Sequence, residues 1–168
     1  MRVVGIDPGT AACGFAVVEE QRGRLHHLEH GCWRTSSGTA LETRLKRLFD
    51  EVGELIRRHR PDAVALEESF VGADARTALS VGQARGAVLV ACAVEGVASR
   101  EYTPNRVKSV ICGYGHADKP QVQRMVKTLL RLPEPPTPHH AADALAVAIC
   151  HALAPPLLEA VGAVRRRP

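Results

Sequence analysis

Aromatic residues are scarce in this chain of 168 residues, where Phe, Tyr and Trp together make up 4%. The hydrophobic core must therefore be assembled from small and branched aliphatic side chains, as in closely packed α/β proteins. Hydrophobic residues account for 45% of the chain and charged residues for 24%, which is the balance of an ordinary globular protein. The length fits a single domain with a substantial core.

The chain also lacks long hydrophobic runs and paired cysteine motifs. Its longest apolar run, residues 87–94, is far shorter than the ~20 residues that span a bilayer, and the N-terminal run is too short for a signal peptide. The five cysteines are odd in number and form no C-x-x-C pair, which argues against a disulfide framework or a zinc site. We therefore expect reduced cysteines, a cytoplasmic protein and no association with a membrane.

The net charge of +4 is unevenly placed along the chain. Residues 1–99 hold twelve lysines and arginines against thirteen acids, whereas residues 100–168 hold ten against five. Such asymmetry suits a polyanion bound by one part of the surface. A solvated basic helix and the terminal arginine run would give the same counts, so charge alone leaves both interpretations open.

Hydrophobic periodicity predicts an alternation of strands and helices. Short β-branched or apolar runs predict five strands, at residues 2–7, 13–20, 24–34, 62–68 and 98–102. Apolar residues three and four positions apart predict helices at residues 41–59, 75–95, 104–112, 119–132 and from 138 onward. The first three strands can form a meander, and the later two follow helices, so they would join in parallel through right-handed crossovers.

This order predicts one α/β domain over residues 1–153, built as a mixed five-stranded sheet flanked by helices. Residues 154–168 contain three prolines and three arginines, and we expect them to form a flexible basic tail.

Acidic residues stand at the ends of two strands that should lie inside the sheet. Asp7 ends the first strand, and Glu67 and Glu68 end the fourth. Ligands of open α/β sheets gather beyond the carboxyl ends of the strands. The last helix can add His140 and Asp143, which are three residues apart on one face. Oxygen-rich clusters suit hard divalent cations, and two such ions about 3.5–4 Å apart serve phosphodiester cleavage in many enzymes.

Each of these residues also has an ordinary structural explanation. Asp7 precedes Pro-Gly and could form an Asx-turn. Glu67 and Glu68 could mark where a strand meets solvent, and since they point to opposite faces only one of them would reach a site. Asp143 could complement a helix dipole, behind a Thr137–Pro138 pair acting as N-cap and first helical residue.

Five motifs in register resemble the RuvC family of crossover junction endodeoxyribonucleases, the Holliday junction resolvases: "GIDPGT", "ALEESF", "GQARG", "VKSVICGYGHADKPQVQRMV" and "HAADALAVA". The resemblance covers about residues 1–153. It implies a ribonuclease H-like fold and a homodimer that binds a four-way junction and nicks two strands of like polarity symmetrically. It also implies Mg²⁺ or Mn²⁺ as cofactor, with two ions expected per active site, and partnership with the RuvA–RuvB branch-migration proteins.

Carried over to this sequence, the resemblance assigns catalytic and metal-binding roles to Asp7, Glu67, His140 and Asp143. Glu68 falls where other members often have a neutral residue, and His140 stands where aspartate is common. A nitrogen ligand shifts preference from magnesium toward manganese, so we expect Mn²⁺ to support activity at least as well as Mg²⁺. We also expect activity to fall as the pH drops through the ordinary histidine value of about 6.5. A histidine that only hydrogen-bonds at the helix start would show neither effect.

The resemblance also points to residues that bind DNA. Lys108 and Lys119 match lysines near the scissile strand, and Phe70 matches an aromatic residue thought to stack on unpaired bases. Arg76 and Arg85 could contact phosphates, although Arg85 could equally pack between helices or at a dimer interface. Solvated surface charge and a core phenylalanine are the ordinary alternatives.

Three classes of function fit parts of this pattern. A metal-dependent junction endonuclease would generate hydroxide, through the metal or through His140 as base, and leave a 5′-phosphate and a 3′-hydroxyl. "GIDPGT" also resembles a turn of actin-like ATPases, but that fold needs a second, duplicated domain that 168 residues cannot supply. A junction-binding protein without catalysis is the third class, which the change to His140 keeps open.

Overall fold

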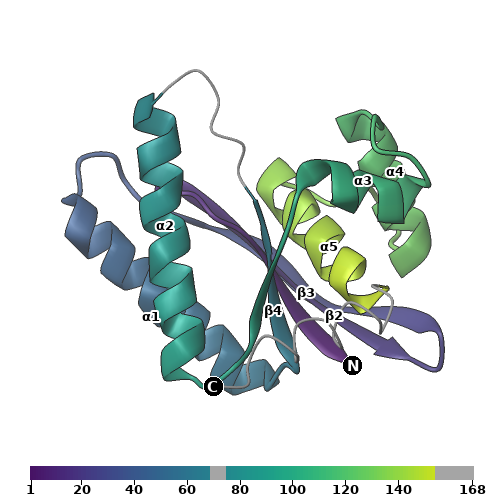
Figure 1. The fold of residues 1–168 in the computed structure, drawn as a ribbon, viewed down its shortest axis with the longest axis horizontal. Coiled ribbons are helices and arrows are strands. Elements are labelled where there is room, and N and C mark those ends of the chain that lie inside the picture. The colour runs from purple at the N-terminus through teal and green to yellow at the C-terminus, as the bar shows by residue number, and fades with distance from the viewer. Residues whose placement is uncertain (69–74, 154–168) are drawn as a thin grey trace, which may run out of the picture.

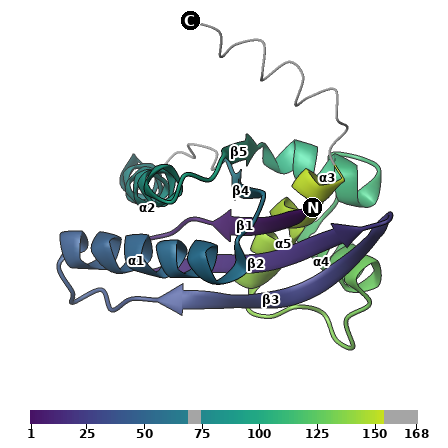
Figure 2. The ribbon, with the colours of Figure 1, turned by 90° about the horizontal axis from the view of Figure 1, so that it is seen from below.

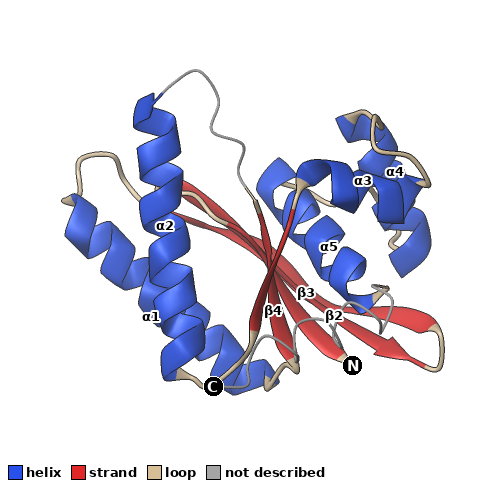
Figure 3. Cartoon of the chain, viewed as in Figure 1, coloured by secondary structure: helices blue, strands red, loops and turns tan. Residues whose placement is uncertain are grey.

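The computed structural model describes residues 1–68 and 75–153. The strands within these ranges are β1 (Arg2–Asp7), β2 (Ala12–Gln21), β3 (Arg24–Arg34), β4 (Ala63–Glu67) and β5 (Ser99–Tyr102). The helices are α1 (Leu41–His59), α2 (Ala75–Val94), α3 (Pro104–Cys112), α4 (Lys119–Leu130) and α5 (His139–Ala152). This confirms the predicted order of elements (Figure 3).

The strands form one sheet in the order β3-β2-β1-β4-β5. β1 pairs antiparallel with β2, and β2 with β3, so the first three strands form the predicted meander. β4 joins β1 in parallel and β5 joins β4 in parallel, each after a helical crossover. The strands that carry Asp7 and Glu67 are therefore neighbours inside the sheet, as their apolar sequences predicted.

Helices cover both faces of this sheet. Figure 1 shows α1 and α2 on one side and α3, α4 and α5 on the other. Alternate residues of β1 pack on the two faces of the sheet. Val4 and Ile6 belong to the hydrophobic cluster with α1 and α2, and Val3 belongs to the cluster with α5. Both clusters are almost wholly aliphatic, which is the core that the scarcity of aromatic residues predicted. Burial of each valine, leucine or isoleucine side chain in these clusters contributes about 1.5–3 kcal/mol.

α5 lies directly against β1 and β2 because glycines stand beneath it. A Cβ atom on Gly5 would overlap the carbonyl oxygen of Ala144, and one on Gly14 would overlap that of His140. The buried face of α5 is correspondingly rich in alanine. This close approach sets the first turn of α5 over the end of β1, where Asp7 lies.

The start of α5 differs from the sequence prediction. The helix begins at His139, and its N-cap is Pro138 with an extended backbone (φ −71°, ψ 175°), so Thr137 and Pro138 are not an N-cap and first helical residue. Pro138 accepts hydrogen bonds through its carbonyl from the backbone N–H groups of Ala141 and Ala142, and no side chain caps the helix. The prediction was wrong because an extended Pro138 lies outside the helix.

α2 is the one helix in the described ranges that is long and apolar enough to cross a membrane, judged by length and composition only. Val88 and Ala91 on one of its faces are buried against the core, whereas Leu79, Val90 and Val94 on another are exposed. A helix that packs in the core on one face and offers a second apolar face to a partner protein has the same composition. The apolar composition of α2 is therefore weak evidence for a membrane span.

Candidate active site

The acidic residues at the strand ends lie side by side. Ile6 of β1 pairs with Leu66 of β4, so the next residue of each strand, Asp7 and Glu67, emerge together at the same edge of the sheet. His140 and Asp143 come from the first turns of α5, which lies over this edge. Residues that are more than 130 positions apart in the chain are thereby brought to one place.

His140 contacts Asp7 directly. Its Nδ1 atom lies 2.6 Å from Asp7 Oδ2, and the imidazole is about half exposed whereas the carboxylate is largely covered. Since an ionised carboxylate only accepts hydrogen bonds, Nδ1–H of His140 donates to Asp7. The lone pair of the neutral ring is then on Nε2, which is the atom left for a proton or a metal ion.

Lys119 brings a positive charge to the same place. Its Nζ lies 3.3 Å from Asp143 Oδ2. Lys119 is the first residue of α4, and this end of the helix is fixed by a capping box between Asp118 and Gln121. Because the ammonium is well exposed, the pair contributes at most about 1 kcal/mol to folding. Its main effect is to hold a cation beside the carboxylates.

Burial and mutual repulsion disfavour ionisation of the clustered acids. Burial raises the pKa of Glu67 to about 7, assisted by the charges of Asp7 and Asp143 and opposed by Lys119 and Lys108. Burial likewise raises the pKa of Asp7, against the hydrogen bond from His140, which lowers it. Carboxylates that are buried together in this way are stabilised by a cation placed among them.

The four side chains do not already form a ligand cage. Within residues 1–68 and 75–153, no group of three or more His, Cys, Asp and Glu side chains has the arrangement of a formed metal site. His140 is turned to Asp7, and Asp143 is turned to Lys119. The chemistry of the donors, three carboxylates and one imidazole, nevertheless fits a divalent cation, and binding of that cation by Asp143 would replace its contact with Lys119.

Two cavities flank the acidic cluster, which consists of Asp7, Glu67 and Asp143. The lysine-side cavity, of about 230 Å³, is lined by Glu67, Lys108, Lys119 and Asp143 together with apolar residues of α3, α4 and α5. Glu67 rather than Glu68 reaches it, which the strand pattern had left undecided.

The α2-side cavity, of about 380 Å³, is lined by the turn after β1, the start of α2 with Arg76 and Ser80, and His140. His140, which contacts Asp7, therefore lies between this cavity and the acids.

Not all predicted contacts gather here. Seven of the predicted side chains lie at or beside the acidic cluster: Asp7, Glu67, His140, Asp143, Lys108, Lys119 and Arg76. Phe70 and residues 154–168 lie outside the described residues. Arg85 instead pairs with Glu101, its Nε donating over 2.6 Å and its second nitrogen also in contact, so it ties α2 to β5.

Sequence reasoning missed several residues that shape the site. Thr10 and Ser80 are hydrogen-bonded to each other through their hydroxyls across the α2-side cavity. Gly5 and Gly14 admit α5. A glycine inside a strand is the available signal for close backbone approach.

Comparison with known proteins indicates the same family as the sequence motifs did, over almost the whole predicted domain. The family model described as "Crossover junction endodeoxyribonuclease RuvC" matches residues 3–151. Proteins of that name from Pelotomaculum thermopropionicum and Rubrobacter xylanophilus are 51% and 50% identical, over 90% and 98% of this chain and 93% and 92% of theirs.

The structure of T. thermophilus RuvC in complex with Holliday junction substrate superposes with a TM-score of 0.88 at 42% identity, covering 91% of this chain and 93% of that one. The yeast mitochondrial Holliday junction resolvase Ydc2, at 11% identity and a TM-score of 0.62, shares the fold alone. The predicted ribonuclease H-like fold is thus confirmed, and the chain belongs to the RuvC family of crossover junction endodeoxyribonucleases.

Proposed function

We propose that this protein is a structure-selective endonuclease that resolves Holliday junctions during DNA recombination and repair. It would make paired, symmetric, metal-dependent nicks in two strands of like polarity. The observation that carries the proposal is the convergence of three carboxylates and one imidazole between two cavities bordered by cationic side chains. Membership of the RuvC family supports the same activity.

Asp7, Glu67, His140 and Asp143 would hold the divalent metal, with two ions per site. When bound, such a cation supplies Lewis-acid activation of water and stabilises charge on the leaving oxygen. The raised pKa values of Asp7 and Glu67 support this assignment, because a nearby cation favours their ionised forms. Since His140 contributes nitrogen where oxygen is common, we propose that manganese serves at least as well as magnesium.

His140 would act either as a cation ligand or as the base. Asp7 accepts the Nδ1 proton and so orients the ring, which leaves a single lone pair on Nε2. That atom would bind the cation or, where the three carboxylates alone hold the cation, take a proton from the attacking water. The water oxygen forms a bond to phosphorus as the bond from phosphorus to the 3′ oxygen breaks. The products are a 5′-phosphate and a 3′-hydroxyl. The leaving 3′ oxygen takes a proton from solvent, and the proton lost by the attacking water passes to His140 Nε2 where that atom is free, or to solvent where it binds the cation.

The basic side chains would hold the DNA. Lys108 and Lys119 line the lysine-side cavity, and Arg76 lines the α2-side cavity, so phosphates on both sides of the scissile bond have a cation within reach. Each phosphate neutralised by such a contact releases counterions and makes binding dependent on salt. Phe70 is proposed to stack on unpaired bases, on the basis of the family resemblance.

α2 would form the dimer interface. Leu79, Gly82, Gly86, Val90 and Val94 recur at helical spacing along one side, and the three large residues are 64%, 55% and 66% exposed. A Cβ atom on Gly82 or Gly86 would meet nothing within 4 Å, so no contact in the described protomer requires glycine there. Each mid-helix glycine costs about 1 kcal/mol relative to alanine, which a closely approaching partner helix would offset. A two-fold dimer presents two equivalent sites.

The family resemblance extends the proposal to the setting in which the enzyme acts. We propose that it works in the cytoplasm with the RuvA and RuvB branch-migration proteins. The five cysteines are unpaired in the structure, which agrees with a reducing compartment.

Cleavage of a mobile four-way junction against a linear duplex of the same sequence tests the proposal. Nick positions would be mapped in Mg²⁺ and in Mn²⁺ at matched concentrations. Symmetric nicks in the junction alone, at least as fast in manganese, are expected. Junction binding with no cleavage in either metal would favour the non-catalytic class, and faster cleavage in magnesium would contradict the role given to the His140 nitrogen.

A further inference from the structure

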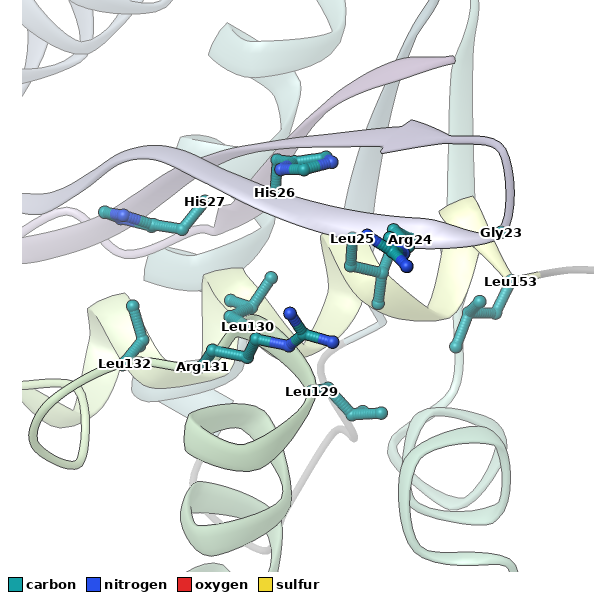
Figure 4. Close-up of a pocket in the computed structure, with 10 residues that line it drawn as sticks. All are labelled: Gly23, Arg24, Leu25, His26, His27, Leu129, Leu130, Arg131, Leu132 and Leu153. Carbon is teal, nitrogen blue, oxygen red and sulfur yellow. The ribbon is translucent and has the colours of Figure 1, made fainter.

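A further concave surface lies at the end of the sheet opposite to the acidic cluster. Here the turn between β2 and β3 faces the C-terminal end of α4, and the groove between them measures about 510 Å³ (Figure 4). β1 runs from Arg2 beside this end to Asp7 at the other, a separation of about 17 Å at ~3.4 Å per residue. Figure 2 shows the hairpin turn at the end of the sheet where the N-terminus lies.

The floor of this leucine groove is apolar. It is formed by Leu25 of the hairpin, Leu129, Leu130 and Leu132 at the end of α4, and Leu153 after α5. Leu130 is buried, but Leu153 is 42% exposed and the other three are half-buried. Its volume lies in the range that accommodates a few large side chains. Such a floor offers little to a nucleic acid, whose outer surface is phosphate and sugar.

The rim of the groove is basic. Arg24, Arg131 and His26 line it and are exposed, and no acidic side chain lines it within the residues that the structure describes. Neither arginine makes an ion pair with any described residue. The neighbouring carboxylate of Glu20 is already engaged, by the backbone N–H of Gly23 at 2.7 Å and by the N-terminal ammonium.

Both walls are held in place without a ligand. The hairpin turn is closed by the Glu20 contact. Arg131, the C-cap that follows α4, has the left-handed conformation (φ 52°), and its backbone N–H donates to the carbonyls of Lys127 and Thr128. Leu132 then donates to Lys127 as well, over 2.9 Å. A preformed surface loses less conformational entropy on binding than a flexible one.

We infer that the leucine groove docks a segment of a partner protein that presents at least two large apolar side chains flanked by carboxylates. The leucines take the apolar side chains, and Arg24 and Arg131 pair with the carboxylates. The acidic cluster stays open to DNA at the other end of the sheet, so docking and junction binding can occur together. The site is independent of the nuclease assignment.

The probe is a fluorescein-labelled peptide of fourteen residues built from Leu and Glu, with leucines at helical spacing. Binding to the full-length protein is measured by fluorescence anisotropy. Double substitution Arg24→Glu and Arg131→Glu should weaken binding at least tenfold. Arg124→Glu, an equal charge change on the exposed side of α4, should change it less than twofold. Arg24→Glu alone provides a variant that leaves the left-handed residue untouched.

Three results would overturn the inference. The first is a failure of charge recognition, seen as equal binding of a matched peptide with Lys in place of every Glu or as binding insensitive to the two arginines. The second is a loss of affinity for duplex DNA as large as that for the peptide, which would make the rim a nucleic-acid surface. The third is tenfold tighter peptide binding by a chain ending at Leu153, which would show that residues 154–168 occupy the groove. The double variant should still nick junctions at the wild-type rate. A loss of peptide binding can then be told apart from a failure of the nuclease proposal.

Discussion

The two ends of the central sheet use charge in opposite ways. At the Asp7 end, carboxylates are gathered in partly buried positions where ionisation is unfavourable, and cations surround them. At the hairpin end, two arginines stand exposed at the rim of an apolar floor, without acidic partners among residues 1–68 and 75–153. The first arrangement stores repulsion that a bound cation relieves, and the second offers charge to a partner. Stability of the free protein and readiness for ligands are therefore distinct properties of the same fold.

The largest effect should follow from removing a carboxylate at the Asp7 end. Asp7→Asn and Glu67→Gln should each lower single-turnover junction cleavage on the order of 10³-fold, because metal-assisted stabilisation is worth several kcal/mol. Junction affinity in a gel-shift assay without divalent metal should be retained. Glu68→Gln is the matched control and should cleave normally, and cleavage lost equally in that variant would contradict the assignment of Glu67.

The second largest effect should follow from disturbing the close packing of α5 on the sheet. Gly14→Ala should destabilise the protein by about 1–3 kcal/mol and reduce cleavage, because the new methyl group displaces the backbone of His140. Thermal and urea unfolding measure the stability change. Gly38→Ala, where an added Cβ meets one side-chain atom at 3.7 Å, should change stability by less than about 0.5 kcal/mol. An unchanged melting temperature for Gly14→Ala would refute the close approach.

The sequence predicts the local features of this fold better than its contacts between distant segments. Periodicity predicted α1 to the residue, and strand ends placed Asp7 and Glu67 at one edge, because these features are local. It could not show that Gly14 lies under His140, since that contact joins segments far apart in the chain. It also extended α4 to residue 132, whereas the chain turns at Arg131, a left-handed residue that is not glycine and so gives no signal.

The third effect is a pH dependence of stability without metal. The folded protein holds a proton on Glu67 up to about pH 7, whereas the unfolded chain releases it near its ordinary value of 4.5. The unfolding free energy should therefore fall as the pH rises from about 4.5 to about 7 and then level off. With allowance for solvent screening, the loss should be about 1–2 kcal/mol.

Urea unfolding in EDTA across this pH range measures the effect. Glu67→Gln should flatten the profile and be more stable than the wild type at pH 8, although it cannot cleave. Asp62→Asn is a control of equal charge change away from the cluster. A wild-type protein that becomes more stable between pH 5 and pH 7 would show that ionisation of the clustered carboxylates does not destabilise the fold.

The smallest effect belongs to the exposed cation of the acidic end. Lys119→Gln should change the unfolding free energy by less than about 1 kcal/mol, since its ion pair with Asp143 is well exposed. It should weaken junction binding and reduce the slope of log affinity against log salt by about 0.9, the contribution of one phosphate. Lys46→Gln, an exposed lysine of α1 paired with Asp50, should leave the slope unchanged.

Direct titration of Mn²⁺ into the DNA-free protein, followed by electron paramagnetic resonance, tests whether Asp7, Glu67, His140 and Asp143 form one cation site. We expect saturable binding by the wild type and by Glu68→Gln, and its loss in Asp7→Asn and in Glu67→Gln. Equal Mn²⁺ binding by all four proteins would show that the metal binds elsewhere in the protein.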